Sequence, residues 1–70
     1  MRYAVVVEKG ETSFGAYVPD LPGCIATAPT RKELERRIRA AIALHLEGMA
    51  EDGIPAPEPS AQVEYVEIDV

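Results

Sequence analysis

The chain has 70 residues, 47% of them hydrophobic, which is enough for one small domain with a core and argues against disorder. A formal net charge of −5 and a pI near 4.7 exclude a surface dominated by Lys and Arg, as phosphate backbones require. This balance suits a basic protein partner, and it equally suits a protein kept soluble by its charge.

Two apolar runs at the start of the chain predict a β-hairpin. Residues 2–8 (RYAVVVE) are dense in β-branched side chains, which predicts a strand buried on both faces. Residues 13–18 (SFGAYV) place Phe14, Ala16 and Val18 on one face. A short polar loop containing a glycine joins the two runs, as in a hairpin.

A third strand is predicted over residues 24–28, where Pro29 ends it. Residues 19–23 (PDLPG) come before it and predict a turn, because proline fixes φ and glycine adopts conformations closed to other residues. The three runs together predict an antiparallel meander.

The clearest element is a helix that begins after Thr30. The Thr30 hydroxyl and the Glu33 carboxylate have capping-box spacing, in which the carboxylate reaches back to the cap. The sequence Asp52-Gly53 suits the helix end, since glycine tolerates the left-handed conformation found there. One helix face is apolar and includes the only histidine: Leu34, Ile38, Ala41, Ile42, His45 and Met49.

A proline-rich strap follows the helix and leads to a last predicted strand. Residues 55–59 (PAPEP) must be extended, and they can carry the chain back along the sheet. Residues 62–70 (QVEYVEIDV) alternate again, which predicts a strand with Val66, Ile68 and Val70 facing the core. The expected fold is therefore α+β, a three-stranded antiparallel meander with one helix packed on the sheet and a final strand (βββαβ), in a single domain over residues 1–70.

The block Val18-Pro19-Asp20-Leu21-Pro22-Gly23-Cys24 resembles a motif of the HicB-like antitoxins. Residues 45–48 (HLEG) within the helix and residues 52–57 (DGIPAP) after it match the same family. The resemblance runs from about Tyr3 to Ser60, which is most of the chain.

This resemblance implies a partial RNase H-like fold without the catalytic set of the nuclease. It implies binding to a HicA-like toxin, a small basic protein that cleaves mRNA and is neutralised by protein–protein contact. Many members carry a further C-terminal DNA-binding segment, which has no counterpart before Val70, so we expect no DNA binding by this chain alone. An orphan scaffold that binds another protein is the alternative.

Two surfaces are candidates for the partner contact. The turn at residues 20–23 has two interpretations: it is a structural turn, or it is a rigid, protruding turn (a knob) that contacts a partner. The acids near the C-terminus read either as a solvated strand face or as groups that steer a basic toxin. The candidate residues are Asp20, Leu21, Pro22, Gly23, Glu67 and Asp69.

Self-association is expected, because a chain this short buries little surface and no disulfide or metal supports it. Leu44 and Gly48 lie beside the apolar stripe of the helix, and a helical glycine favours close packing by a neighbour, either the proline-rich strap or a second subunit. We expect a homodimer or a larger homo-oligomer with these two residues in its interface.

No enzymatic activity, metal, cofactor or catalytic residue is predicted. A degenerate RNase H-like nuclease would need clustered carboxylates such as Glu8 to hold magnesium, and no compact acidic motif is present. His45 and Cys24 fit packed positions better than catalytic ones. Five basic residues on the first helical turns pair with nearby acids or contact a partner: Arg31, Lys32, Arg36, Arg37 and Arg39.

The cellular setting is expected to be the cytosol, since the chain has a single thiol, no signal peptide and no run of about 18 apolar residues. Asparagine is absent, and Arg outnumbers Lys. Both features fit a heat-adapted source or a GC-rich genome.

Overall fold

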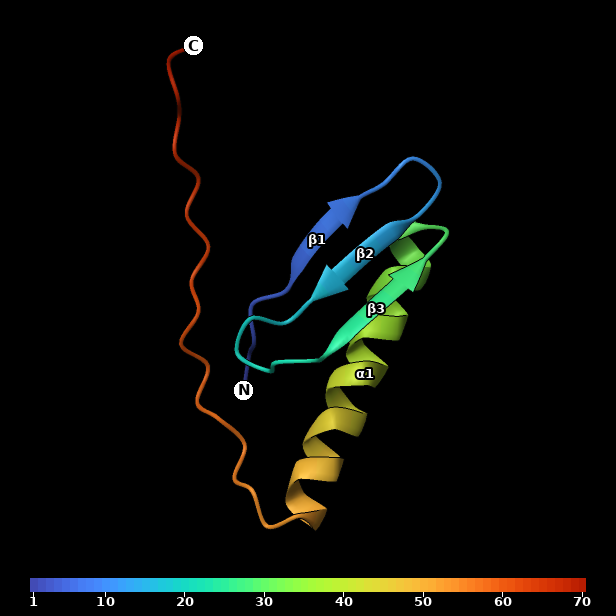
Figure 1. Ribbon diagram of the computed structural model, residues 1–70, viewed down its shortest axis with the longest axis vertical. Coiled ribbons are helices and arrows are strands. Elements are labelled where there is room, and N and C mark those ends of the chain that lie inside the picture. Colours follow the sequence, from blue (N-terminus) through green and yellow to red (C-terminus); the bar gives the residue numbers. More distant parts are fainter.

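The computed structural model covers residues 1–70 and contains a three-stranded antiparallel sheet followed by one helix (Figure 1). The strands are β1 (Val6–Lys9), β2 (Phe14–Tyr17) and β3 (Ile25–Ala28), and the helix is α1 (Arg31–Glu51). The sheet order is β1-β2-β3. The predicted meander and helix are confirmed, with strands shorter than their apolar runs because fewer residues pair across the sheet.

The core lies between α1 and one face of the sheet. α1 packs on β3 and β2 and leaves β1 uncovered. The prediction that the first strand is buried on both faces is therefore wrong, and Val7 of β1 is exposed. The fully buried side chains come from β2, β3, the turn between them and the first half of α1: Ala16, Val18, Leu21, Cys24, Ala28, Leu34 and Ile38.

The ends of α1 follow the sequence signals. Thr30 caps the helix, and its hydroxyl accepts a hydrogen bond from the Glu33 amide at 3.2 Å. Gly53 has a φ of 72° and follows the C-cap, as the end of an α-helix favours. Only half of the expected capping box forms, because the Glu33 carboxylate accepts hydrogen bonds from Arg36 and Arg37 instead of reaching back.

The chain after α1 has two parts, which we name the strap (residues 54–61) and the tail (residues 62–70). The strap turns back past the sheet, and the tail continues away from the body of the molecule (Figure 1). The tail is extended but forms no strand, so the predicted inward position of Val66, Ile68 and Val70 is wrong, and all three are exposed. A strand needs a hydrogen-bonded neighbour, and no backbone hydrogen bond joins the tail to β1.

Candidate protein-interaction surface

The uncovered edge of β1 is the first feature of the candidate surface. β1 pairs with β2 on one side only, so half of its backbone N–H and C=O groups have no partner in the sheet. Its inner face continues the core side of β2, because Val7 lies opposite Ala16 in the register. An edge of this kind can accept an additional strand.

Two grooves of about 530 Å³ each flank β1 and share part of its lining. The inner groove lies between β1 and α1, and its apolar lining includes Val5, Val7, Ile38 and Ile42. The outer groove lies between β1 and the tail, with Val63 and Tyr65 of the tail among its lining residues. Apolar side chains therefore line both approaches to the free edge.

Basic side chains surround these grooves although the whole chain is acidic. Arg2, Arg31 and Arg39 line the inner groove together with one acid, Glu35, and Lys9 and Arg31 line the outer one. None of them forms an ion pair within 4.0 Å, because the only ion pairs join Glu33 to Arg36 and Arg37. The grooves therefore suit an apolar segment that carries negative charge.

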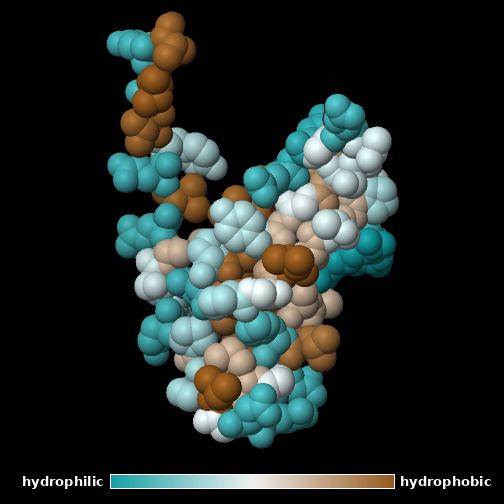
Figure 2. Space-filling view, viewed as in Figure 1, coloured by the Kyte–Doolittle hydropathy of each residue, from teal (hydrophilic) through white to brown (hydrophobic).

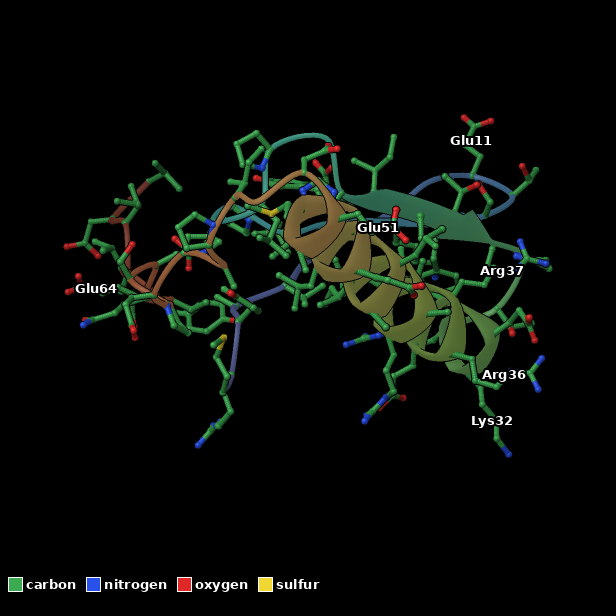
Figure 3. The ribbon with its side chains drawn as sticks, turned by 90° about the horizontal axis from the view of Figure 1, so that it is seen from below. Glu11, Lys32, Arg36, Arg37, Glu51 and Glu64 are labelled. Carbon is green, nitrogen blue, oxygen red and sulfur yellow. The ribbon has the colours of Figure 1, made fainter.

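Glu33 holds two members of the basic cluster on α1. Its carboxylate lies 2.6 Å from the Arg36 guanidinium and 3.2 Å from that of Arg37, which also donates to the Thr27 carbonyl oxygen at 2.8 Å. Partial burial acts to raise the pKa of Glu33, but the hydrogen bonds and charges of the two arginines outweigh it and lower this pKa. The sequence-based pairing is confirmed for these residues. Lys32, Arg36 and Arg37 lie at the end of the molecule opposite Glu64 of the tail (Figure 3).

The outer face of the sheet is the second feature, and no helix covers it. The register aligns Val6, Tyr17 and Ile25 in one row across the three strands, which we name the outer row. Tyr17 is 42% exposed and Ile25 is 66% exposed. Figure 2 views the molecule from the side of the sheet and shows hydrophobic side chains among hydrophilic ones on this face. Such a row is a ready contact for a partner.

Asp20 fixes the strap to the turn between β2 and β3. Its carboxylate accepts hydrogen bonds from the Ser60 amide at 3.0 Å, the Ser60 hydroxyl at 2.9 Å and the Ala61 amide at 3.1 Å. The bond from the Ala61 amide and the two from Ser60 lower the pKa of Asp20. The Tyr3 hydroxyl donates to the Pro57 carbonyl oxygen at 2.6 Å and holds the strap at a second point.

The predicted contact residues fall into separate places. Leu21 is only 1% exposed and belongs to the core, so its side chain is not part of any knob, whereas Pro22 and Gly23 at the tip of the turn are exposed. Gly23 has a φ of 87°, which a turn with a glycine at this position requires. Glu67 and Asp69 lie on the tail, beyond the point where Asp20 holds the chain, and the structure does not bring them to the turn.

On α1, the predicted interface residues are accessible. Leu44 is 70% exposed, and a side chain at Gly48 would meet nothing within 4 Å. Leu46 was missed by the sequence analysis and packs against the core. The free edge of β1 and the basic side chains that line the grooves beside it were also missed. A continuous apolar run in the sequence does not show whether a strand will lie at the edge of the sheet or away from the helix.

The groups with chemical reactivity are dispersed. No three side chains of His, Cys, Asp or Glu come together in an arrangement that could hold a metal ion. Cys24 is buried, and burial raises the pKa of its thiol, which disfavours the reactive thiolate. α1 is not apolar enough to span a membrane.

Comparisons with known proteins agree with this arrangement. The family model described as HicB_like antitoxin of bacterial toxin-antitoxin system matches residues 3–69. A chain in a solved structure of the HicA3 and HicB3 toxin-antitoxin complex has a similar fold, with a TM-score of 0.72 and 28% identity. The similarity covers 86% of the present chain and 70% of that one.

Relatives occur in a phage and in an archaeon. A 14.9 kDa protein in the rep-hol intergenic region of Haemophilus phage HP1 is 33% identical over 66 residues, which are 94% of the present chain but 50% of the phage protein. A UPF0150 protein of Thermoplasma acidophilum is 32% identical over 63 residues, which are 89% of this chain and 91% of the relative. The chain thus spans half the length of one relative and nearly all of another.

Proposed function

The chain belongs to the HicB-like antitoxin family, and from this premise we propose that it neutralises a small, basic, RNA-cleaving toxin of the HicA type by direct contact. The uncovered outer face of the sheet is the observation that carries the proposal. It presents Tyr17 and Ile25 side by side, and apolar side chains of this size at the centre of an interface supply most of its stability.

The charge of the chain supports the same partner. A net charge of −5 attracts a basic protein and suppresses acidic competitors. Glu67 and Asp69 are exposed and form no ion pair, so they are free to pair with a basic toxin. Pro22 and Gly23 add a rigid tip beside β3, which begins at Ile25. No residue of the chain needs to perform chemistry in this role.

The test is to look for a short basic protein encoded next to this chain and to measure RNA cleavage by that protein with and without the chain. We expect cleavage to stop when the two proteins are equimolar. The Ile25→Lys variant should raise the dissociation constant about 10- to 100-fold, because it places a charge in the contact that faces a basic partner. Leu44→Lys introduces the same side chain on the far side of the core and is the matched control. Full cleavage at a large excess of the wild-type chain would contradict the proposal.

The kinetics provide a second readout. The association rate should fall steeply as salt rises, because steering by charge raises such rates about 10- to 10³-fold and is screened beyond about 8 Å at physiological ionic strength. Replacing Glu67 and Asp69 by Gln and Asn should slow association. Ile25→Ala should instead speed dissociation. An association rate that is indifferent to salt would refute the steering.

A further inference from the structure

The tail has the sequence of a strand but no strand partner. Val, Ile and Tyr residues alternate with acids along it except at the adjacent pair Tyr65-Val66, and this composition favours a half-buried strand. Yet Tyr65 is 94% exposed, Val66 70% and Ile68 67%. Hydrophobic side chains stand clear of the body along the tail (Figure 2). The last residue that the body holds by a hydrogen bond is Ala61.

The isolated chain exposes more surface than a compact protein of its mass. Its accessible surface is 5777 Å², whereas a compact 7.6 kDa monomer exposes about 4,300 Å². Its radius of gyration is 13.8 Å, against about 11 Å for a compact chain of this length. The excess of about 1,500 Å² in each copy is enough for a stable interface, since such interfaces bury about 1,200–2,000 Å² in total.

The outer groove is where this surface can be covered. It is bounded by β1 on one side and by Val63 and Tyr65 of the tail on the other, so two extended segments face each other across it without sheet hydrogen bonds. Both segments run towards the top of Figure 1, so they are parallel. The Asp20 and Tyr3 contacts fix the strap before the tail begins and set the tail beside β1 rather than against it.

We propose that two copies of this chain exchange tails, each tail adding as a strand to the free edge of the partner's β1. In a dimer with a two-fold axis normal to the sheet, the exchanged tail enters the outer groove and runs antiparallel to β1. It also runs antiparallel to the resident tail, and antiparallel pairing is slightly more stable than parallel pairing. The strand order becomes β3-β2-β1-tail-tail-β1-β2-β3, in which no edge of β1 is left unpaired.

The acidic tail of a second copy of this chain is complementary in charge to the basic side chains along the grooves beside β1, which favours it as the segment that fills the outer groove. The tail carries Glu64, Glu67 and Asp69 and no basic residue. Basic side chains outnumber acidic ones along the grooves on either side of β1, where Glu35 is the one acid. The basic residues there have no ion-pair partner: Arg2, Lys9, Arg31 and Arg39.

The exchange follows from the free edge of β1 and the exposed tail, so it does not rest on the proposed function. The two proposals share Val6, which lines the outer groove, and the tail acids Glu67 and Asp69, whereas Tyr17 and Ile25 of the outer row do not line this groove.

The decisive variant is Val66→Pro, because proline removes an amide that the new ladder needs and is excluded from the interior of a sheet. The tail makes no contact that holds the body together, so this variant should fold like the wild type by circular dichroism. Glu58→Pro is the matched control, since it adds the same residue to a strap that is already proline-rich and extended.

We expect sedimentation to show a wild-type dimer at micromolar concentration. Glu58→Pro should also be dimeric, whereas Val66→Pro should have a dissociation constant about 100-fold higher, because the substitution acts at both exchanged strands. In hydrogen exchange, the amides of β1 and the tail of the wild type should become more protected as protein concentration rises.

Three outcomes would overturn the exchange. A wild-type monomer at all concentrations with an unprotected tail is one. Tail protection that does not depend on concentration would mean that the tail closes on its own β1. A dimer that survives Val66→Pro but dissociates in Leu44→Lys would place the interface on α1.

Discussion

Asp20 illustrates how a turn residue acquires a structural role at a distance. It lies 40 residues before Ser60, yet its carboxylate holds the amides of Ser60 and Ala61 together with the Ser60 hydroxyl. Aspartate in a proline-rich turn is ordinarily explained by local hydrogen bonding. Here the carboxylate holds the last residues before the tail, while the Tyr3 hydroxyl holds the strap earlier, at Pro57.

The Asp20→Asn variant should free the strap. It keeps the size of the side chain but removes the charge that strengthens its three hydrogen bonds, so the Ser60 and Ala61 amides should exchange with solvent about tenfold faster or more. Glu11→Gln removes a charge from an exposed loop and is the control. Unchanged exchange in Asp20→Asn would show that the strap is held without this carboxylate.

The hydrogen bonds from Ser60 and Ala61 to the Asp20 carboxylate should also respond to acid. Because folding lowers the pKa of Asp20 below its ordinary value of 3.8, its contribution to stability is complete above that value and is lost as the pH falls through the lower, folded pKa. In nuclear magnetic resonance, the Ser60 and Ala61 amide signals should titrate below pH 3.8. A midpoint above that value would contradict the observed bonding.

Among the elements, α1 contributes to the fold unevenly along its length. Leu34, in its first turn, is 1% exposed and belongs to the core, whereas Leu44 is 70% exposed. Ile38 is the only other buried residue of the helix. The most deeply buried positions of α1 therefore lie in its first half. The second half packs on the core through partly buried side chains and leaves Leu44 accessible to a partner or a second copy.

Substituting the two leucines of α1 separates these halves. Leu34→Ala should lower the free energy of unfolding by about 2–5 kcal/mol, because it removes a packed side chain and leaves a cavity. Leu44→Ala should change it by no more than about 0.5 kcal/mol, as exposed positions do. Urea denaturation measures both. If Leu44→Ala costs as much as Leu34→Ala, then Leu44 is buried between copies, as the sequence suggested.

At the scale of the whole molecule, the chain is expected to lack nuclease activity. Two-metal cleavage needs carboxylates that hold ions about 4 Å apart. The acids of this chain do not form such a cluster. RNA incubated with the purified chain and magnesium should stay intact. Cleavage that is lost in Glu8→Ala would show a degenerate RNase H-like enzyme instead of a binding protein.

The sequence by itself determined the features that depend on neighbours along the chain. The alternation of residues 13–18 set the inward face of β2, and Thr30 with Gly53 set the ends of α1, because propensity, periodicity and capping act over a few residues. The motifs at residues 18–24, 45–48 and 52–57 predicted the family, and the family model that matches residues 3–69 confirms it.

Only the tertiary structure decided which strand and which turn residues stay accessible. Strand pairing and burial depend on segments that are distant along the chain, and alternation does not name the partner of a strand. The tail therefore has a strand sequence without a strand, and β1 keeps a free edge because no segment pairs with it on the side away from β2. Leu21 is buried and Asp20 is engaged for the same reason, since the residues that cover or bind them come from α1 and the strap.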